Sequence, residues 1–221
     1  MTPLGFETIS EQGSQPTPDA NVAQSSTYTY QNTTCVDAII AARAAGKTTQ
    51  PVSVCNTTVI LTSSAATIVT VSGLAAAKQY LSAPAYQSLA AATAAGTVKG
   101  RSYSQAFNNI TDQETQSGYF YYDGSHAWVT QSYRGTQGNH QCNVSWAVGY
   151  YVTNTGCTDT GSTSQRNLTM SWLIQVGIKG SPISWGESHT MHVNSAGSIW
   201  QQPLSERGKM PCSPIQLHRY I

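Results

Sequence analysis

The densest group of chemically capable side chains lies at residues 185–192, which read Trp-Gly-Glu-Ser-His-Thr-Met-His. Glu187, His189 and His192 are residue types that act as general acids and bases or bind divalent cations. Successive side chains of a strand point to opposite faces, so His189 shares a face with Met191 and His192 points the other way. Two ligands of one ion would have to converge. We therefore expect no metal site here, with His189 near the core edge and His192 at the surface.

Other catalytic patterns are weak. The chain contains no G-x-S-x-G motif and no Gly-rich phosphate loop, and its ten carboxylate residues form no pair with a defined geometry. His140 and Cys142 form a close His–Cys pair that could share a strand face. Cys142 also begins an apolar row, which favours a structural role. We expect no catalytic residue and no cofactor, and keep a secreted hydrolase with a hidden site as an alternative.

The five cysteines favour disulfides over zinc, because no C-x-x-C pair occurs. Cys35 and Cys55 can be joined, since a helix of about ten residues rises only ~15 Å and the nine residues after it can return that distance. A bond between Cys142 and Cys157 requires the chain to bend, and Gly149 is the residue suited to a bend. The remaining cysteine, Cys212, would be free or would link to another chain.

Two stretches alternate between apolar and polar residues, at 142–152 and 168–178. Such alternation is typical of antiparallel strands with one face on a core. Trp146 and Trp172 belong to the apolar rows, so both are expected in the core.

The whole chain is predicted to be mainly β, with an antiparallel β-sandwich over residues 99–202. Residues 27–98 form a small α/β portion with two or three short helices, and residues 203–221 an irregular tail. Residues 1–26 read as an extended or mobile arm, which could add a strand to a partner. We expect helices at 34–46, 74–81 and 84–95 and strands at 27–31, 52–55, 59–61 and 67–71. A hairpin is predicted around Asp123-Gly124 and a second one at 185–201, with turns at 135–138 and 155–161.

Composition restricts the class of function. Charged residues make up 10% of the chain, against roughly 25% in an ordinary soluble domain, so neutral polar groups supply its polarity. The net charge is +1 and no basic run occurs, which argues against nucleic-acid binding. No apolar segment reaches the length of about 18 residues that crosses a membrane. The first residues lack the features of a signal peptide. The protein is therefore either intracellular or a mature chain with an added Met, and the composition leads us to expect an extracellular location.

Aromatic residues gather in the second half of the chain and suggest a binding surface. Tyr121 and Tyr151 are predicted to project from a polar sheet face, with Trp185 at its rim. Exposed aromatic rings among neutral polar groups suit protein or glycan recognition. The expected function is therefore a secreted, non-enzymatic recognition or assembly module. The other alternative is a filament or particle subunit that assembles through residues 1–26 or Cys212.

Overall fold

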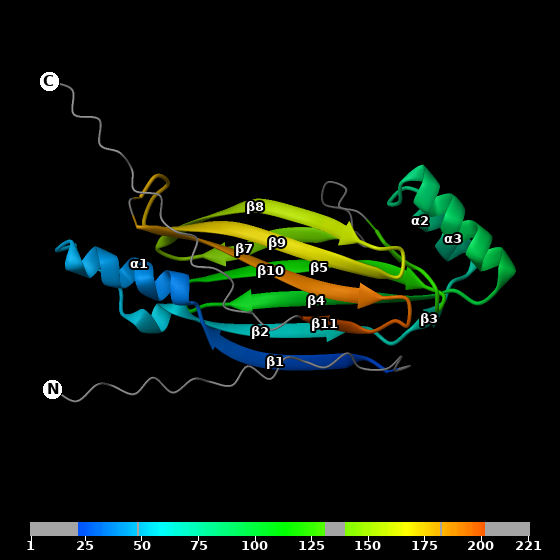
Figure 1. The fold of residues 1–221 in the computed structure, drawn as a ribbon, viewed down its shortest axis with the longest axis horizontal. Helices are drawn as coiled ribbons and strands as arrows, with labels where there is room; N and C mark the ends of the chain where they lie inside the picture. Colours follow the sequence, from blue (N-terminus) through cyan, green and yellow to red (C-terminus); the bar gives the residue numbers. More distant parts are fainter. Residues whose placement is uncertain (1–21, 48, 131–139, 182, 202–221) are drawn as a thin grey trace, which may run out of the picture.

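The computed structural model describes residues 22–47, 49–130, 140–181 and 183–201, which form two antiparallel sheets packed face to face (Figure 1). This confirms the predicted mainly β, antiparallel fold with a small helical part. The first strands are β1 (Gln24–Gln31), β2 (Asn56–Ser63), β3 (Thr67–Ile68), β4 (Lys99–Asn108), β5 (Asp112–Tyr122) and β6 (Ala127–Val129). The others are β7 (Gln141–Ala147), β8 (Tyr150–Gly161), β9 (Gln165–Val176), β10 (Ser184–Asn194) and β11 (Ile199–Gln201).

The larger sheet runs in the order β1-β2-β4-β5-β6, with β3 added to β4 and β7 added to β5. The smaller sheet runs β11-β10-β9-β8. Because β2 pairs with β4 from Thr58 to Ser63, the sandwich is not confined to residues 99–202 but begins at β1. One sheet therefore runs across the predicted boundary between residues 98 and 99. Residues 24–26 of the predicted arm belong to β1, while residues 1–21, the turn at 135–138, Cys212 and the tail lie outside the described residues.

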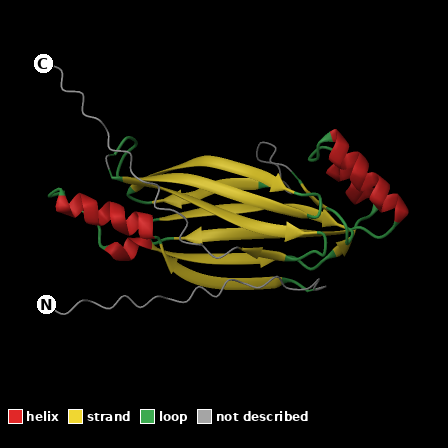
Figure 2. Cartoon of the chain, viewed as in Figure 1, coloured by secondary structure: helices red, strands yellow, loops and turns green. Residues whose placement is uncertain are grey.

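Helices cover the two ends of the sandwich. Helix α1 (Thr33–Ala44) lies at one end, and α2 (Val71–Ala77) and α3 (Ala83–Ala95) lie at the other (Figure 2). Helix α1 is capped by the side chain of Asn32, which accepts from the Cys35 N–H at 2.9 Å. The predicted strand at 52–55 is a single turn of 3₁₀ helix, η1 (Val52–Cys55). Within the described residues, no helix is long and apolar enough to span a bilayer.

The predicted strand at 142–152 is two strands, because the chain turns at Val148 and Gly149 and crosses from one sheet to the other. Gly149 has φ +73°, a conformation that glycine adopts without steric cost. The bend brings Cys142 of β7 and Cys157 of β8 together in a disulfide with Cα atoms 5.7 Å apart. The second predicted disulfide, Cys35–Cys55, is also present and ties α1 to η1. Both predicted pairings are confirmed.

Two further local predictions were wrong in detail. Residues 155–161 are not a turn but the second half of β8, paired with β9. Their polar character fits the solvent-facing outer edge of the smaller sheet. The hairpin after β5 is present, but its loop has four residues, 123–126, instead of two. The Asp123 side chain accepts from the N–H groups of Ser125 and His126 at 2.8 and 2.7 Å, which stabilises the longer loop.

The two tryptophans expected in the core, Trp146 and Trp172, differ in how far they are buried. Trp172 is 1% exposed and packs between the sheets, as predicted. Trp146 is 41% exposed, so its predicted burial was wrong. The pairing of β5 with β7 shifts between Gln113 and Glu114, which places Trp146 opposite Gln113 on the outer face of the larger sheet. A bulge reverses the side-chain direction of every residue beyond it.

Candidate functional site

The residue group singled out at 185–192 lies on β10, and its histidines point to opposite faces as predicted. His189 pairs with Met170 on the inner face, while His192 pairs with Asn167 on the outer face. His192 is nevertheless only 7% exposed, because Trp200 of β11 stacks on its ring with centroids 5.1 Å apart.

The inner residues of β10 form an enclosed hydrogen-bonded cluster between the sheets. The Tyr30 hydroxyl lies 2.7 Å from His189 Nε2 and donates to Glu187 Oε2 at 3.3 Å. The indole of Trp185 donates to Glu187 Oε1 at 3.0 Å. The side chains of Glu187 and His189 are only 3% and 2% exposed, so both lie in the interior between the sheets. Desolvation, the main cause, raises the pKa of Tyr30 well above its ordinary value, which keeps the phenol protonated. This cluster joins β1 to β10.

A second buried acid, Glu114 of β5, faces the same interior. It is fully buried, and its carboxyl oxygens have no hydrogen-bond partner among the described residues. Burial raises the pKa of Glu114 to about 10, with the neighbouring carboxyls of Asp112 and Glu187 adding to the shift. Glu114 is therefore a neutral acid at neutral pH.

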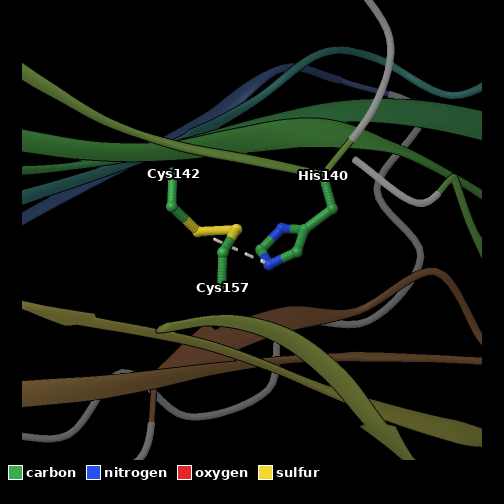
Figure 3. A group of neighbouring side chains, drawn as sticks. All are labelled: His140, Cys142 and Cys157. Atoms are coloured by element: carbon green, nitrogen blue, oxygen red, sulfur yellow. Dashed lines mark hydrogen bonds between the residues drawn. A yellow bond between two sulfur atoms is a disulfide. The ribbon is translucent and has the colours of Figure 1, made fainter. Parts of the chain in front are cut away.

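His140 lies beside the disulfide that connects the two sheets (Figure 3). Its Nε2 atom is 3.7 Å from Cys142 Sγ, and its Nδ1 atom is 3.0 Å from the Tyr103 hydroxyl. Burial lowers the pKa of His140 to about 4, so the imidazole is neutral at neutral pH. His140 precedes β7 and is not part of the strand, but its ring lies close to Cys142, and Cys157 joins the two from β8.

A half-open pocket of about 300 Å³ lies between α2 and the outer face of the larger sheet. We call it the tyrosine pocket, because three tyrosines contribute to its wall. Its ten lining residues are Thr67, Ile68, Val69, Thr70, Gly73, Ala76, Tyr80, Tyr119, Tyr121 and Thr130. Six of these ten carry a hydroxyl group and none carries a charge. The pocket therefore offers hydrogen-bonding groups and aromatic rings without an electrostatic preference.

The strands position the rings of this pocket. Tyr119 and Tyr121 lie on the face of β5 opposite to Phe120 and Tyr122, so both project outward, and their ring centroids are 5.0 Å apart at 60°. Tyr119 lies over Gly100 of β4, where any larger side chain would collide with its ring. Its hydroxyl is 3.2 Å from Thr67 Oγ1. Burial raises the pKa of Tyr121 to about 12, and the neighbouring phenols of Tyr119 and Tyr80 add to this shift.

The outer face that continues from the pocket is also uncharged. Outward-facing side chains of β2, β4 and β5 pair across the strands, and within these strands none of them is Asp, Glu, Lys or Arg. These residues include Thr58, Thr62, Ser102, Ser104, Asn108, Thr115 and Ser117. The tyrosine pocket thus lies at one end of a neutral, hydroxyl-rich sheet face.

The structure does not bring together the three residues predicted to bind a ligand. Tyr121 lines the tyrosine pocket, although α2 and α3 leave it only 8% exposed. Tyr151 is 39% exposed on the other sheet, with Lys179 Nζ 5.9 Å from its ring centroid. Trp185 does not lie at an exposed rim. It is 6% exposed, because its register places it on the inner face with Glu187.

Sequence reasoning missed the other members of the pocket. Tyr119 is in the same alternating row as Tyr121 and could have been found from that row. Tyr80 follows α2 and approaches the sheet only through tertiary contacts.

Comparisons of the chain with protein-family models, with curated proteins and with solved structures found no match.

Proposed function

We propose that this protein is a secreted, non-enzymatic recognition module that binds an uncharged carbohydrate in the tyrosine pocket. The observation that carries the proposal is the lining of this pocket, which has six hydroxyl-bearing residues and no charged residue. Sugar hydroxyls both donate and accept hydrogen bonds, and so do the hydroxyls of Thr and Tyr. A tyrosine ring also offers an apolar surface next to its polar end, which matches the apolar face of a sugar ring.

Electrostatics favour a neutral ligand over an ionic one. A phosphate or carboxylate ligand would need a basic partner, and none of the ten lining residues supplies one. Because burial raises the pKa of Tyr121 to about 12, its phenol keeps its proton and remains a hydrogen-bond donor. The neutral sheet face next to the pocket offers further hydroxyls to a ligand longer than one sugar unit.

Secretion is supported by the cysteines and by the low charge. Two disulfides, Cys35–Cys55 and Cys142–Cys157, are formed, and such bonds persist in oxidising compartments. The small fraction of charged residues, 10%, fits the same location.

Filling the pocket tests this function. Ala76 lines the pocket on an exposed part of α2, and Ala75 is an exposed neighbour that does not line it. Binding of a panel of neutral oligosaccharides should be measured by NMR titration for the wild type, Ala76→Trp and Ala75→Trp. We expect Ala76→Trp to abolish binding and Ala75→Trp to leave it unchanged.

Substitutions that remove one tyrosine hydroxyl at a time should reduce the binding affinity by smaller steps. Tyr121→Phe and Tyr80→Phe should each weaken binding about 2- to 10-fold, the effect of one hydrogen bond. Tyr151→Phe, on the opposite sheet, should have no effect. If no neutral oligosaccharide perturbs the pocket signals, or if Ala76→Trp binds as well as the wild type, carbohydrate recognition at this pocket is wrong. A protein ligand would then be the next candidate for the neutral sheet face.

A further inference from the structure

Three side chains with metal-binding atoms converge at the corner where the chain crosses between the sheets. His140 precedes β7, Cys142 lies on β7, and Cys157 lies on β8 (Figure 3). Their ligand atoms, one His nitrogen and two sulfurs, lie within 4.8 Å of one another. The described residues contain no other group of three or more such ligands. These atoms come from two different sheets, so whatever joins them also joins the sandwich.

Tyr103 orients the imidazole toward the sulfurs. Its hydroxyl lies 3.0 Å from Nδ1, while Nε2 faces Cys142 Sγ at 3.7 Å. When Nδ1 carries the proton and donates it to the Tyr103 oxygen, the Nε2 lone pair points at the sulfur atoms. Histidines that bind metals are usually held in this way by a partner on the second ring nitrogen. Tyr103 is 2% exposed on β4, so its position is fixed by the core.

We propose that, once the Cys142–Cys157 disulfide is reduced, His140, Cys142 and Cys157 bind a thiophilic divalent cation of the zinc type. The cation would replace the disulfide as the link between the two sheets. Two thiolates and one imidazole are the ligand types that zinc selects, and water can fill the fourth tetrahedral position. Calcium and magnesium require oxygen ligands, so this donor set would not hold them.

The chemistry balances with a dithiol as the reductant. The dithiol is oxidised to its own disulfide, and its two electrons and two protons convert the protein disulfide to two thiols. Metal binding then releases the two thiol protons, because the thiolate is the ligand form. Oxidation of the thiolates would re-form the disulfide and release the cation. The disulfide and the metal are therefore mutually exclusive links at the same place.

Cobalt(II) provides a spectroscopic test, since thiolate ligation gives a charge-transfer band and tetrahedral geometry gives intense visible bands. The full chain carrying Cys212→Ser is first reduced with a dithiol, and the reductant is then removed under oxygen-free conditions. The reduced protein is titrated with Co²⁺ and afterwards with Zn²⁺. We expect one cobalt per chain with both features, displaced by zinc, and none in the oxidised protein. The double variant Cys35→Ser/Cys55→Ser should retain the cobalt site, and the double variant Cys142→Ser/Cys157→Ser should lose it.

The histidine and its orienting partner separate a built site from adventitious thiol binding. His140→Ala should reduce affinity at least 100-fold, while His126→Ala, at an exposed loop position, should change nothing. Tyr103→Phe should reduce affinity about 10- to 100-fold. Tyr150→Phe removes a different core hydroxyl and should leave affinity unchanged. Cobalt bound equally well by His140→Ala, by the Cys142/Cys157 double variant or by the oxidised chain would overturn the proposal.

A redox titration keeps the proposal falsifiable if a fully reduced chain loses its fold. The fraction of Cys142–Cys157 disulfide is followed by thiol alkylation and mass mapping across a series of dithiol/disulfide ratios, with and without Zn²⁺. A 100-fold stabilisation of the dithiol form by zinc raises its apparent potential by about 59 mV. We expect such a rise in the wild type and none in His140→Ala. The same potential with and without zinc would refute the site.

Discussion

The indole of Trp172 and the imidazole of His189 are stacked, with ring centroids 5.1 Å apart and planes inclined by 19°. They stand on neighbouring strands of the smaller sheet, β9 and β10. Phe107 of the larger sheet closes the group, with its centroid 5.2 Å from Trp172 and 4.3 Å from His189. Three rings from both sheets thus form the centre of the sandwich, and the hydrogen bonds of Tyr30 and Glu187 surround His189.

Trp172→Ala should destabilise the protein by about 3–5 kcal/mol, because it leaves a large cavity among buried rings. Trp146→Ala is the matched control. Since Trp146 is 41% exposed, its truncation should cost less than about 1 kcal/mol. Urea unfolding followed by circular dichroism measures both. Equal losses for the two variants would contradict the placement of Trp146 outside the core.

His189→Ala should cost about 2–4 kcal/mol, because it removes a core ring and leaves the Tyr30 hydroxyl without its partner at 2.7 Å. His192→Ala should cost about 1–2 kcal/mol, since His192 lies on the outer face, bonded to Asn167 at 2.8 Å. Chemical denaturation of the two variants gives the comparison. A larger loss in His192→Ala would reverse this order and count against the opposite-face arrangement as the determinant of stability.

Glu114 should make the fold less stable as pH rises. Its pKa is raised from 4.5 to about 10 in the folded protein, so the folded state keeps a proton that the unfolded state releases above pH 4.5. The free energy of unfolding should therefore fall between these pH values, by up to about 1.4 kcal/mol per pH unit. Glu114→Gln cannot ionise and should flatten this slope between pH 5 and 9.

Asp37→Asn is the control for Glu114, because it removes one acid from the exposed surface of α1. This variant should keep the slope of the wild type in denaturant titrations at several pH values. If Glu114→Gln retains that slope as well, the carboxyl ionises inside the fold and its burial does not set the pH dependence.

Arg101 is a buried cation whose described hydrogen-bond acceptors are neutral oxygens. It is fully buried and donates to Ser64 O at 3.0 Å, Gly197 O at 2.8 Å and Ser63 Oγ at 2.7 Å. These acceptors belong to segments of both sheets. Arg101→Lys should cost about 2–4 kcal/mol, because one ammonium cannot satisfy acceptors spread around a planar guanidinium.

Arg43→Lys is the matched substitution for Arg101, since Arg43 makes similar bonds to Thr49 and to the Gln50 carbonyl at the surface. It should change the free energy of unfolding by no more than about 0.5 kcal/mol. Thermal and urea unfolding of both variants would test this. A negligible effect of Arg101→Lys would mean that the interior carbonyls are satisfied in another way.

The sequence by itself determined the features that depend only on the alternation of side chains along a strand and on the spacing between residues. The alternation from Leu168 onward placed Trp172 inside, and the separation of three residues placed His189 and His192 on opposite faces. The Cys35–Cys55 disulfide followed from how far the chain travels between the two cysteines, while the Cys142–Cys157 disulfide was predicted only on the condition that the chain bends at Gly149, as it does. These features depend on local backbone geometry, which neighbouring residues set.

Only the tertiary structure decided the features that depend on a partner strand or helix. Trp146 faces outward because the bulge between β5 and β7 reverses the direction of the side chains beyond it. The alternation of apolar and polar residues in the sequence does not reveal such a bulge. Trp185 is buried because of its register opposite Ile174. That register is set by the pairing of β10 with the preceding strand, β9, and not by the sequence of β10 alone.

Both candidate sites come from such long-range pairing. The tyrosine pocket joins Tyr80 to Tyr119, and these segments meet where α2 lies against the outer face of the larger sheet. The ligand group joins His140 to Cys157, and the corner at Gly149 brings those residues into contact. A sequence motif records residues at a fixed local spacing. These sites instead combine residues whose separation along the chain is set by strand length and sheet order, so only the folded protein reveals them.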